Sequence, residues 1–372
     1  MRTALPAPVL TRIVSRPDLF EGGAVAHAID TMTGERVVRP EFTGSAAEYF
    51  RIWIVNLAFT LATLGIYSPW AKVRKKRYFY GATRLDGDTF DYFGNPKQIL
   101  KGRIVAFAIF ALYALSGELL PNSEYAFWAV GFVAFPWLAV RALGFNARNS
   151  AWRGLRFDFD ATAKQAARVY ILRFLGVIAS LGIAWPWFVA RQKEFIVSHH
   201  AFGMTRLRCE LPVRSFFGIY IRGVLIVVAL SVPLGVLMAF SIPLLRLRPD
   251  LVWIPLTLGM IATYASYAVG YAYVQARTTN LMWSGISADG VRFASTLGAR
   301  RLAALYIGNI VAAAISVGLL IPWGAVRVLR YRLENFTMTV EHEQSHLANP
   351  ELARVGATSQ ELGDFFNLNI GL

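Results

Sequence analysis

The chain has 372 residues, of which 55% are hydrophobic and only 16% are charged. A soluble domain carries roughly 25% charged residues, so this composition excludes an ordinary water-soluble protein and indicates an integral membrane protein. The formal net charge is +15. We assign the excess to the positive-inside pattern of membrane proteins, and expect anionic lipid headgroups as partners and no nucleic acid.

The chain begins with a polar segment. Residues 1–41 contain several arginines and prolines but no apolar run, so we expect a mobile N-terminal tail without a signal peptide. We expect the membrane domain to follow over residues 42–340 and a C-terminal tail to cover residues 341–372.

Long apolar runs fill the membrane domain. Two pairs of runs cover residues 104–115 with 125–140, and 224–245 with 251–274. Three more runs stand alone at residues 52–70, 174–190 and 302–326. Most are close to the ~20 residues that a helix needs to cross the hydrocarbon. The runs therefore predict a mainly α fold, a polytopic helical membrane protein.

Each single run contains the same phrase, Gly-x-x-x-Pro-Trp. The three copies are Gly65, Pro69 and Trp70; Gly182, Pro186 and Trp187; and Gly318, Pro322 and Trp323. Glycine and proline interrupt helices, so we expect Gly/Pro-broken helices. A phrase that recurs along the chain indicates internal repeats, and we expect three related units at about residues 42–148, 149–276 and 277–340.

Short stretches between the runs alternate apolar and polar side chains. They lie at residues 155–159, 207–211 and 336–340, and such alternation is typical of half-buried strands. Open strand edges cannot lie in lipid. We therefore expect small juxtamembrane β elements at the cytoplasmic face.

Charge leaves two topologies open. Basic segments flank the single run at residues 174–190 on both sides, and the positive-inside rule places both in the cytoplasm. Either the three single runs enter the membrane and return, which leaves four full crossings, or all seven runs cross and the repeats are inverted. We favour the re-entrant arrangement.

Several segments resemble a known family. The residues at 42–44, 67–72, 83–87, 361–366 and 370–372 are similar to the YjgN family, a bacterial inner-membrane family classed as a domain of unknown function. The resemblance runs from about residue 40 to the C-terminus. It implies a multi-pass protein of the bacterial inner membrane, and it implies no activity, cofactor or catalytic residue.

One motif suggests metal chemistry. His342, Glu343 and His346 spell H-E-x-x-H, which binds zinc when both histidines share one face of a helix. Here the motif follows a strand-like run, and Pro350 soon interrupts any helix. We therefore expect no enzyme, no metal and no cofactor, and keep a zinc-dependent membrane hydrolase only as a third hypothesis.

A few polar side chains interrupt the apolar runs. Asn56, Arg173 and Asn309 occupy matching positions in the three single runs, and Tyr264, Tyr267 and Tyr271 form a stripe in the last paired run. Polar groups at membrane depth either line a path or cross-link helices. We therefore predict passage of a solute or lipid as the function, with a non-enzymatic scaffold that docks partners as the alternative.

Overall fold

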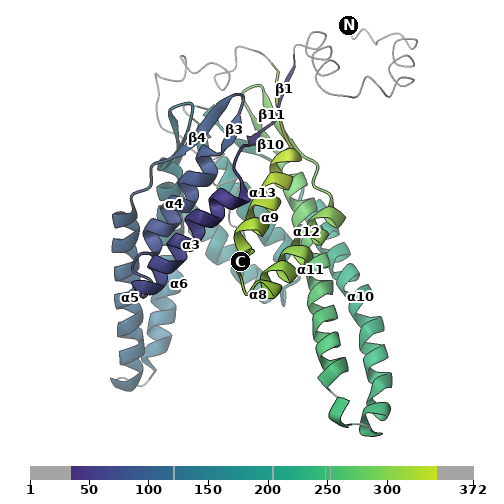
Figure 1. Cartoon of the computed structure of the whole chain (residues 1–372). Coiled ribbons are helices and arrows are strands. Elements are labelled where there is room, and N and C mark those ends of the chain that lie inside the picture. The colour runs from purple at the N-terminus through teal and green to yellow at the C-terminus, as the bar shows by residue number, and fades with distance from the viewer. Residues whose placement is uncertain (1–34, 120–121, 203–204, 248, 252, 342–372) are drawn as a thin grey trace, which may run out of the picture.

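The computed structural model describes residues 35–119, 122–202, 205–247, 249–251 and 253–341. This part of the chain is mainly helical, as the apolar runs predict. Three short helical hairpins and two long ones extend from one side of a layer of strands (Figure 1). The short hairpins are α3 (Ala46–Ala62) with α4 (Ser68–Gly81); α7 (Ala163–Ala167), η2 (Arg168–Arg173) and α8 (Phe174–Ala179) with α9 (Trp185–Ser198); and α12 (Ala299–Ile315) with α13 (Ile321–Glu334). The long hairpins are α5 (Pro96–Leu119) with α6 (Ser123–Arg148), and α10 (Val213–Leu247) with α11 (Trp253–Ser284), joined by η3 (Pro249–Leu251).

The strands form two antiparallel sheets, a larger β component than the small elements expected from the sequence. The seven-stranded sheet runs in the order β2 (Glu41–Phe42), β3 (Thr83–Leu85), β4 (Asp88–Tyr92), β5 (Ser150–Trp152), β6 (Leu155–Phe159), β7 (His200–Phe202) and β8 (Thr205–Arg206). The five-stranded sheet runs in the order β1 (Arg36–Val38), β12 (Phe336–Val340), β11 (Val291–Ser295), β10 (Ile286–Ala288) and β9 (Arg208–Cys209). The first strand lies ahead of the boundary expected at residue 42.

The two sheets enclose one core. Short links join β1 to β2 and β8 to β9, so the sheet edges meet at both ends. Alternate side chains of both sheets point into a single apolar cluster, in which Phe90, Trp152, Phe157, Phe293 and Phe336 are all buried. The edge strands β1, β2, β8 and β9 have only two or three residues each, so the described residues offer little open edge to pair with another chain.

Every helical hairpin starts and ends in neighbouring strands. The antiparallel pairs that bracket the five hairpins are β2 with β3, β4 with β5, β6 with β7, β9 with β10, and β11 with β12. Both ends of each hairpin are therefore fixed at the sheets. The three single apolar runs consequently turn back on themselves within the protein.

The turns at the three breaks share one backbone conformation. Leu64, Leu181 and Val317 have φ of 50°, 51° and 50°, and the glycines that follow have φ of 91°, 90° and 88°. A hydroxyl holds each turn: Thr63, Ser180 and Ser316 each accept a hydrogen bond from the backbone N–H four residues later, at 2.9 Å. The glycine is needed because a φ near 90° lies outside the small left-handed region, at φ of about 50–70°, that other residues can occupy.

Within the described residues, three helices are long and apolar enough to cross a membrane. They cover Pro96–Gly117, Ser123–Arg148 and Val213–Phe240, and at most 6% of each apolar window is buried within the described structure. In Figure 1 the long hairpins diverge below the sheets like the legs of an inverted V, while the short hairpins end between them.

Candidate functional site: an arginine groove and a tyrosine stripe

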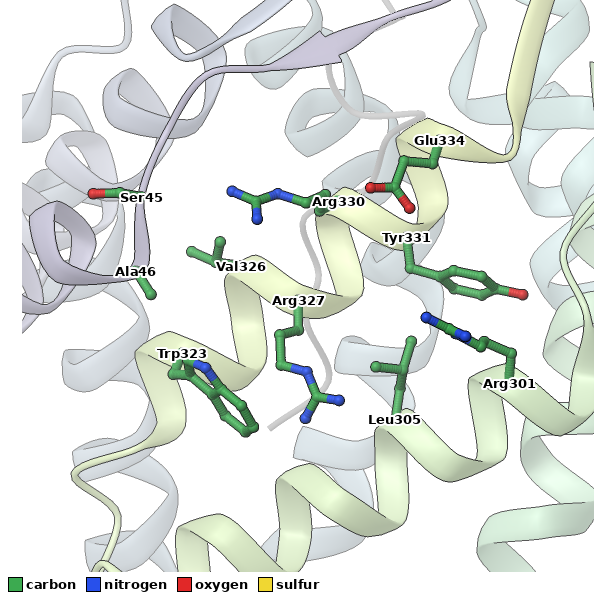
Figure 2. Close-up of a pocket in the computed structure, with 10 residues that line it drawn as sticks. All are labelled: Ser45, Ala46, Arg301, Leu305, Trp323, Val326, Arg327, Arg330, Tyr331 and Glu334. Carbon is green, nitrogen blue, oxygen red and sulfur yellow. The ribbon is translucent and has the colours of Figure 1, made fainter. Parts of the chain in front are cut away.

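A polar groove opens between the third short hairpin and the start of α3 (Figure 2). Its volume is about 390 Å³, which is within the range of small-ligand sites. The groove is lined by Ser45, Ala46, Arg301, Leu305, Trp323, Val326, Arg327, Arg330, Tyr331 and Glu334. Three of these side chains are arginines and one is acidic, so the groove carries a net positive charge.

The groove arginines have few partners within the described part of the chain. Arg327 stacks on Trp323, with its guanidinium carbon 4.2 Å from the ring centroid, and its Nη1 lies 3.4 Å from Asn309 Oδ1. Arg330 donates one hydrogen bond of 3.2 Å to the backbone oxygen of Gly44. Arg301 is exposed and has no ion pair or hydrogen bond in this part of the structure. Since each guanidinium has five N–H donors, most of them remain available.

Helical spacing places these residues together. Trp323, Arg327, Arg330 and Glu334 recur every three or four residues along α13, so they share one face of the helix. Figure 2 shows Arg301 reaching from α12 toward the same space. α12 lies beside α13 because the Gly318 turn reverses the chain between them.

The other two short hairpins lack this cluster. Counted from the break glycine, the position of Arg330 is held by Glu194 in the second hairpin, where it pairs with Arg191 at 2.5 Å. The position of Arg301 is held by Gln165 in the second hairpin and by Glu48 in the first. The third hairpin therefore differs from its counterparts in charge, although all three share the break.

The predicted tyrosine stripe lies on the surface of α11. Tyr264, Tyr267 and Tyr271 are 69%, 59% and 59% exposed. Tyr271 continues the stripe to α12, because its ring centroid is 5.8 Å from that of Tyr306. Tyr306 in turn accepts a hydrogen bond of 3.0 Å from Arg332 of α13. The stripe thus leads from the apolar part of α11 to a cation.

A second cation lies close to the end of this stripe. Lys193 of α9 is half-buried, and its Nζ lies 3.9 Å from the sulfur of Met282. Burial lowers the pKa of Lys193, and the charge of Arg332 lowers it further. Helices α9, α11, α12 and α13 therefore bring hydroxyls and positive charges to one region below the sheets.

The three polar residues at matching positions lie on separate hairpins. Asn309 cross-links its hairpin, because its Nδ2 donates to the backbone oxygen of Gly324 at 3.1 Å. Arg173 lies 5.9 Å from the Trp187 ring, and Asn56 is buried with Oδ1 unpartnered in the described structure. No hydrogen bond or ion pair in that part joins Asn56, Arg173 and Asn309 to one another.

The histidines and the cysteine give no metal site within the described residues. No group of three His, Cys, Asp or Glu side chains could hold an ion there, and the H-E-x-x-H motif at residues 342–346 lies outside them. His200 is fully buried and donates from Nδ1 to the backbone oxygen of Ile196. Burial lowers the pKa of His200 to about 3, so this side chain is neutral at pH 7.

Sequence reasoning missed Arg301, Arg330, Tyr306 and Arg332. An arginine follows each break Trp at the same distance, at Arg74, Arg191 and Arg327, but this spacing does not show which residues lie beside it in space. The signal available was a comparison of the three units, since Arg301 and Arg330 replace an acidic or neutral residue in at least one other unit.

Sequence comparison gives the chain a family. Residues 38–365 match the family described as bacterial protein of unknown function (DUF898). An "Inner membrane protein YjgN" of Salmonella typhimurium is 23% identical over 366 residues, which cover 83% of this chain and 90% of that protein. A protein of the same name from Escherichia coli is 24% identical over 236 residues, or 62% of this chain and 54% of that protein. No solved structure matches. The match to the YjgN proteins confirms the resemblance seen in the sequence. Because the family model covers nearly the whole chain, the protein belongs to the DUF898 family.

Proposed function

We propose that the protein is a four-crossing protein of the inner membrane, with three re-entrant hairpins, that lets a lipid pass along the tyrosine stripe. The inner membrane follows from the names of the relatives. The apolar tips of the short hairpins support re-entry: Leu64, Leu181 and Val317 are 95%, 94% and 92% exposed. Large aliphatic side chains in a left-handed turn are stabilised when lipid covers them.

Four crossings account for the strand pairing. Three helices of the described chain satisfy the length and hydropathy of a membrane span, and α11 is the return of the third. Since β9 before α10 pairs with β10 after α11, α11 brings the chain back to the side it left. The same argument returns α6 to the side of α5.

Three related units explain the repeated turn. The Ser45–Tyr78 pair of the first short hairpin and the Gly298–Tyr331 pair of the third lie at matching positions. In each, the tyrosine hydroxyl bonds the backbone N–H and C=O of the partner. The recurrence of this contact supports internal repetition.

The tyrosine stripe is the observation that carries the functional proposal. An enclosed solute path would surround polar side chains with protein, but Tyr264, Tyr267 and Tyr271 are all more than half exposed. Such an open track suits a lipid, whose headgroup needs polar contacts while its tails stay in the hydrocarbon. Tyr306 and Arg332 at the end of the stripe favour an anionic headgroup.

A docking role has less support from the charges. Several arginines on the strand layer are already neutralised: Arg206 pairs with Asp160, and Arg292 pairs with Glu35 and Glu341. Arginines paired in this way attract an acidic partner weakly.

Lipid passage is tested in vesicles of phosphatidylcholine and phosphatidylglycerol that contain a trace of headgroup-labelled fluorescent phosphatidylglycerol. Dithionite bleaches the label in the outer leaflet. With the reconstituted protein we expect bleaching to extend to the label that starts in the inner leaflet. The triple variant Tyr264→Phe, Tyr267→Phe, Tyr271→Phe should lose this effect, and Tyr125→Phe, an exposed membrane tyrosine on α6, should keep it. Bleaching confined to the outer leaflet with the wild-type protein would contradict lipid passage.

A further inference from the structure

We infer that the arginine groove between α3, α12 and α13 is a binding site for the phosphate of an anionic phospholipid from the leaflet on the sheet side. This site is separate from the tyrosine stripe. The groove would hold such a lipid whether or not lipids pass across the membrane.

The charge of the groove calls for an anion. Arg301, Arg327 and Arg330 line one volume with Glu334, and Glu334 forms no ion pair with them in the described structure. Like charges that share a groove repel each other unless a counter-ion joins them. A phosphate accepts several hydrogen bonds at once and matches the fork of donors on a guanidinium.

The order of side chains along α13 follows the order of groups in a phospholipid. The exposed Val317, Leu319 and Leu320 form the apolar tip of the hairpin. Trp323 comes next, and tryptophan prefers the interface between hydrocarbon and headgroups. Arg327 and Arg330 follow about 6 Å and about 10 Å farther along the helix, at 1.5 Å per residue. Acyl chain, interface and phosphate would therefore meet matching side chains in turn.

The apolar lining separates a lipid from a free anion. Leu305 and Val326 line the same groove as the arginines, and they would contact the glycerol and the first methylenes of a lipid. Inorganic phosphate could use only the arginines. A ligand that needs both the arginines and the apolar side chains of the groove is therefore a lipid.

The other hairpins supply matched controls. Arg74 lies at the same distance from Trp70 as Arg327 does from Trp323, and it is exposed outside the groove. Arg300 is the exposed neighbour of Arg301 on α12 and does not line the groove. The double variant Arg301→Gln, Arg327→Gln and the control Arg74→Gln, Arg300→Gln lose the same charge. Arg330 stays in place because it bonds to Gly44.

The experiment titrates the purified full chain, in a neutral detergent, with dihexanoyl-phosphatidylglycerol, with dihexanoyl-phosphatidylcholine and with inorganic phosphate, and measures binding by calorimetry. We expect the wild-type protein and the control variant to prefer the phosphatidylglycerol. The groove variant should bind it roughly 10- to 30-fold more weakly, the loss of two basic contacts near a membrane surface. Equal binding by the groove variant and the control would overturn the site. Equal binding of inorganic phosphate and of the lipid would overturn the assignment to a lipid.

The outcome is independent of the lipid-passage assay. A groove variant that binds the lipid weakly but keeps wild-type bleaching kinetics would support the binding site. Lipid passage along the tyrosine stripe would then be decided by the tyrosine variants alone. Thermal unfolding of the groove variant provides a folding check, and we expect little change because Arg301 and Arg327 make few contacts with the protein.

Discussion

Replacing Gly182 with alanine tests whether the second apolar run turns or crosses. Gly182 has φ of 90° and no atom within 4 Å of the position that a Cβ would take, so the backbone conformation alone sets the cost. A left-handed conformation costs an L-residue about 1–2 kcal/mol. The alanine regains about 0.4–1 kcal/mol because it restricts the unfolded chain. The net result is a destabilisation of about 1 kcal/mol.

A straight crossing helix predicts the opposite sign. In a continuous helix, glycine is less favourable than alanine by roughly 0.5–1 kcal/mol, so Gly182→Ala would stabilise the protein. Gly131→Ala in α6 is the matched control, since this helical glycine also has free space around its Cβ position, and we expect it to stabilise. Reversible unfolding in mixed micelles, followed by circular dichroism, measures both. If Gly182→Ala stabilises the protein as Gly131→Ala does, Gly182 does not lie in a left-handed turn and the second apolar run does not turn back there.

Three other perturbations follow from the strand layer. Lowering the pH from 7 to 5 should cost about 2 kcal/mol of stability through His200. The pKa of His200 is lowered from 6.5 to about 3 in the folded protein. Unfolding therefore takes up a proton between pH 7 and pH 5, and the protein becomes less stable as the pH falls. Unfolded in urea, the variant His200→Gln should lose about 2 kcal/mol less stability than the wild-type protein over the same pH change. If the variant keeps the pH dependence of the wild type, His200 is not its source. Arg153→Ala should lower the free energy of unfolding by about 2 kcal/mol, because the guanidinium of Arg153 pairs with Asp86 at 2.7 Å and with Asp88 at 2.5 Å. The control Arg208→Ala, on an exposed residue, should change it by less than about 0.5 kcal/mol. Similar values for the two variants would refute a stabilising role of these ion pairs. Cys209 should react with maleimide only after unfolding, because it is buried and burial raises the pKa of its thiol to about 12; rapid labelling of the folded protein would contradict its place in the core.

The repeated phrase allowed the breaks to be predicted, because glycine and proline act locally. The phrase did not show how the turn is held. Thr63, Ser180 and Ser316 precede each break glycine by two residues, and their hydroxyls accept a hydrogen bond from the backbone N–H of the residue just before the returning helix. Serine and threonine are common in loops, so this signal emerges only when the three copies are compared with the structure in hand.

The sheets were harder to predict than the helices. Alternation predicted β6 and β12, each five residues long, but β3, β5, β7 and β10 have three residues each, too few to show a period. At residues 207–211 only Arg208 and Cys209 form a strand. These strands are fixed by pairing between distant segments, which sequence periodicity does not report.

The groove illustrates the same limit for function. Arg301 and Arg327 are separated by a turn, and each alone reads as an ordinary surface arginine. Only the reversal at Gly318 brings α12 and α13 side by side and places both guanidiniums on one volume. The tyrosine stripe, by contrast, lies on one helix, so its spacing could be predicted, although its continuation through Tyr306 to Arg332 could not.

The central claim is that all five hairpins leave from and return to one side of the membrane. It is tested by single cysteines in a Cys209→Ala background, labelled in spheroplasts with a membrane-impermeant maleimide before and after permeabilisation. Arg84→Cys, Arg156→Cys and Arg292→Cys replace exposed residues on strands of different units, and we expect all three to react only after permeabilisation. Asn122→Cys, at the turn of the first long hairpin, should react in intact spheroplasts. Reaction of some but not all of the three strand positions in intact spheroplasts would place the strands on both sides of the membrane, which would contradict the re-entrant hairpins and support seven crossings.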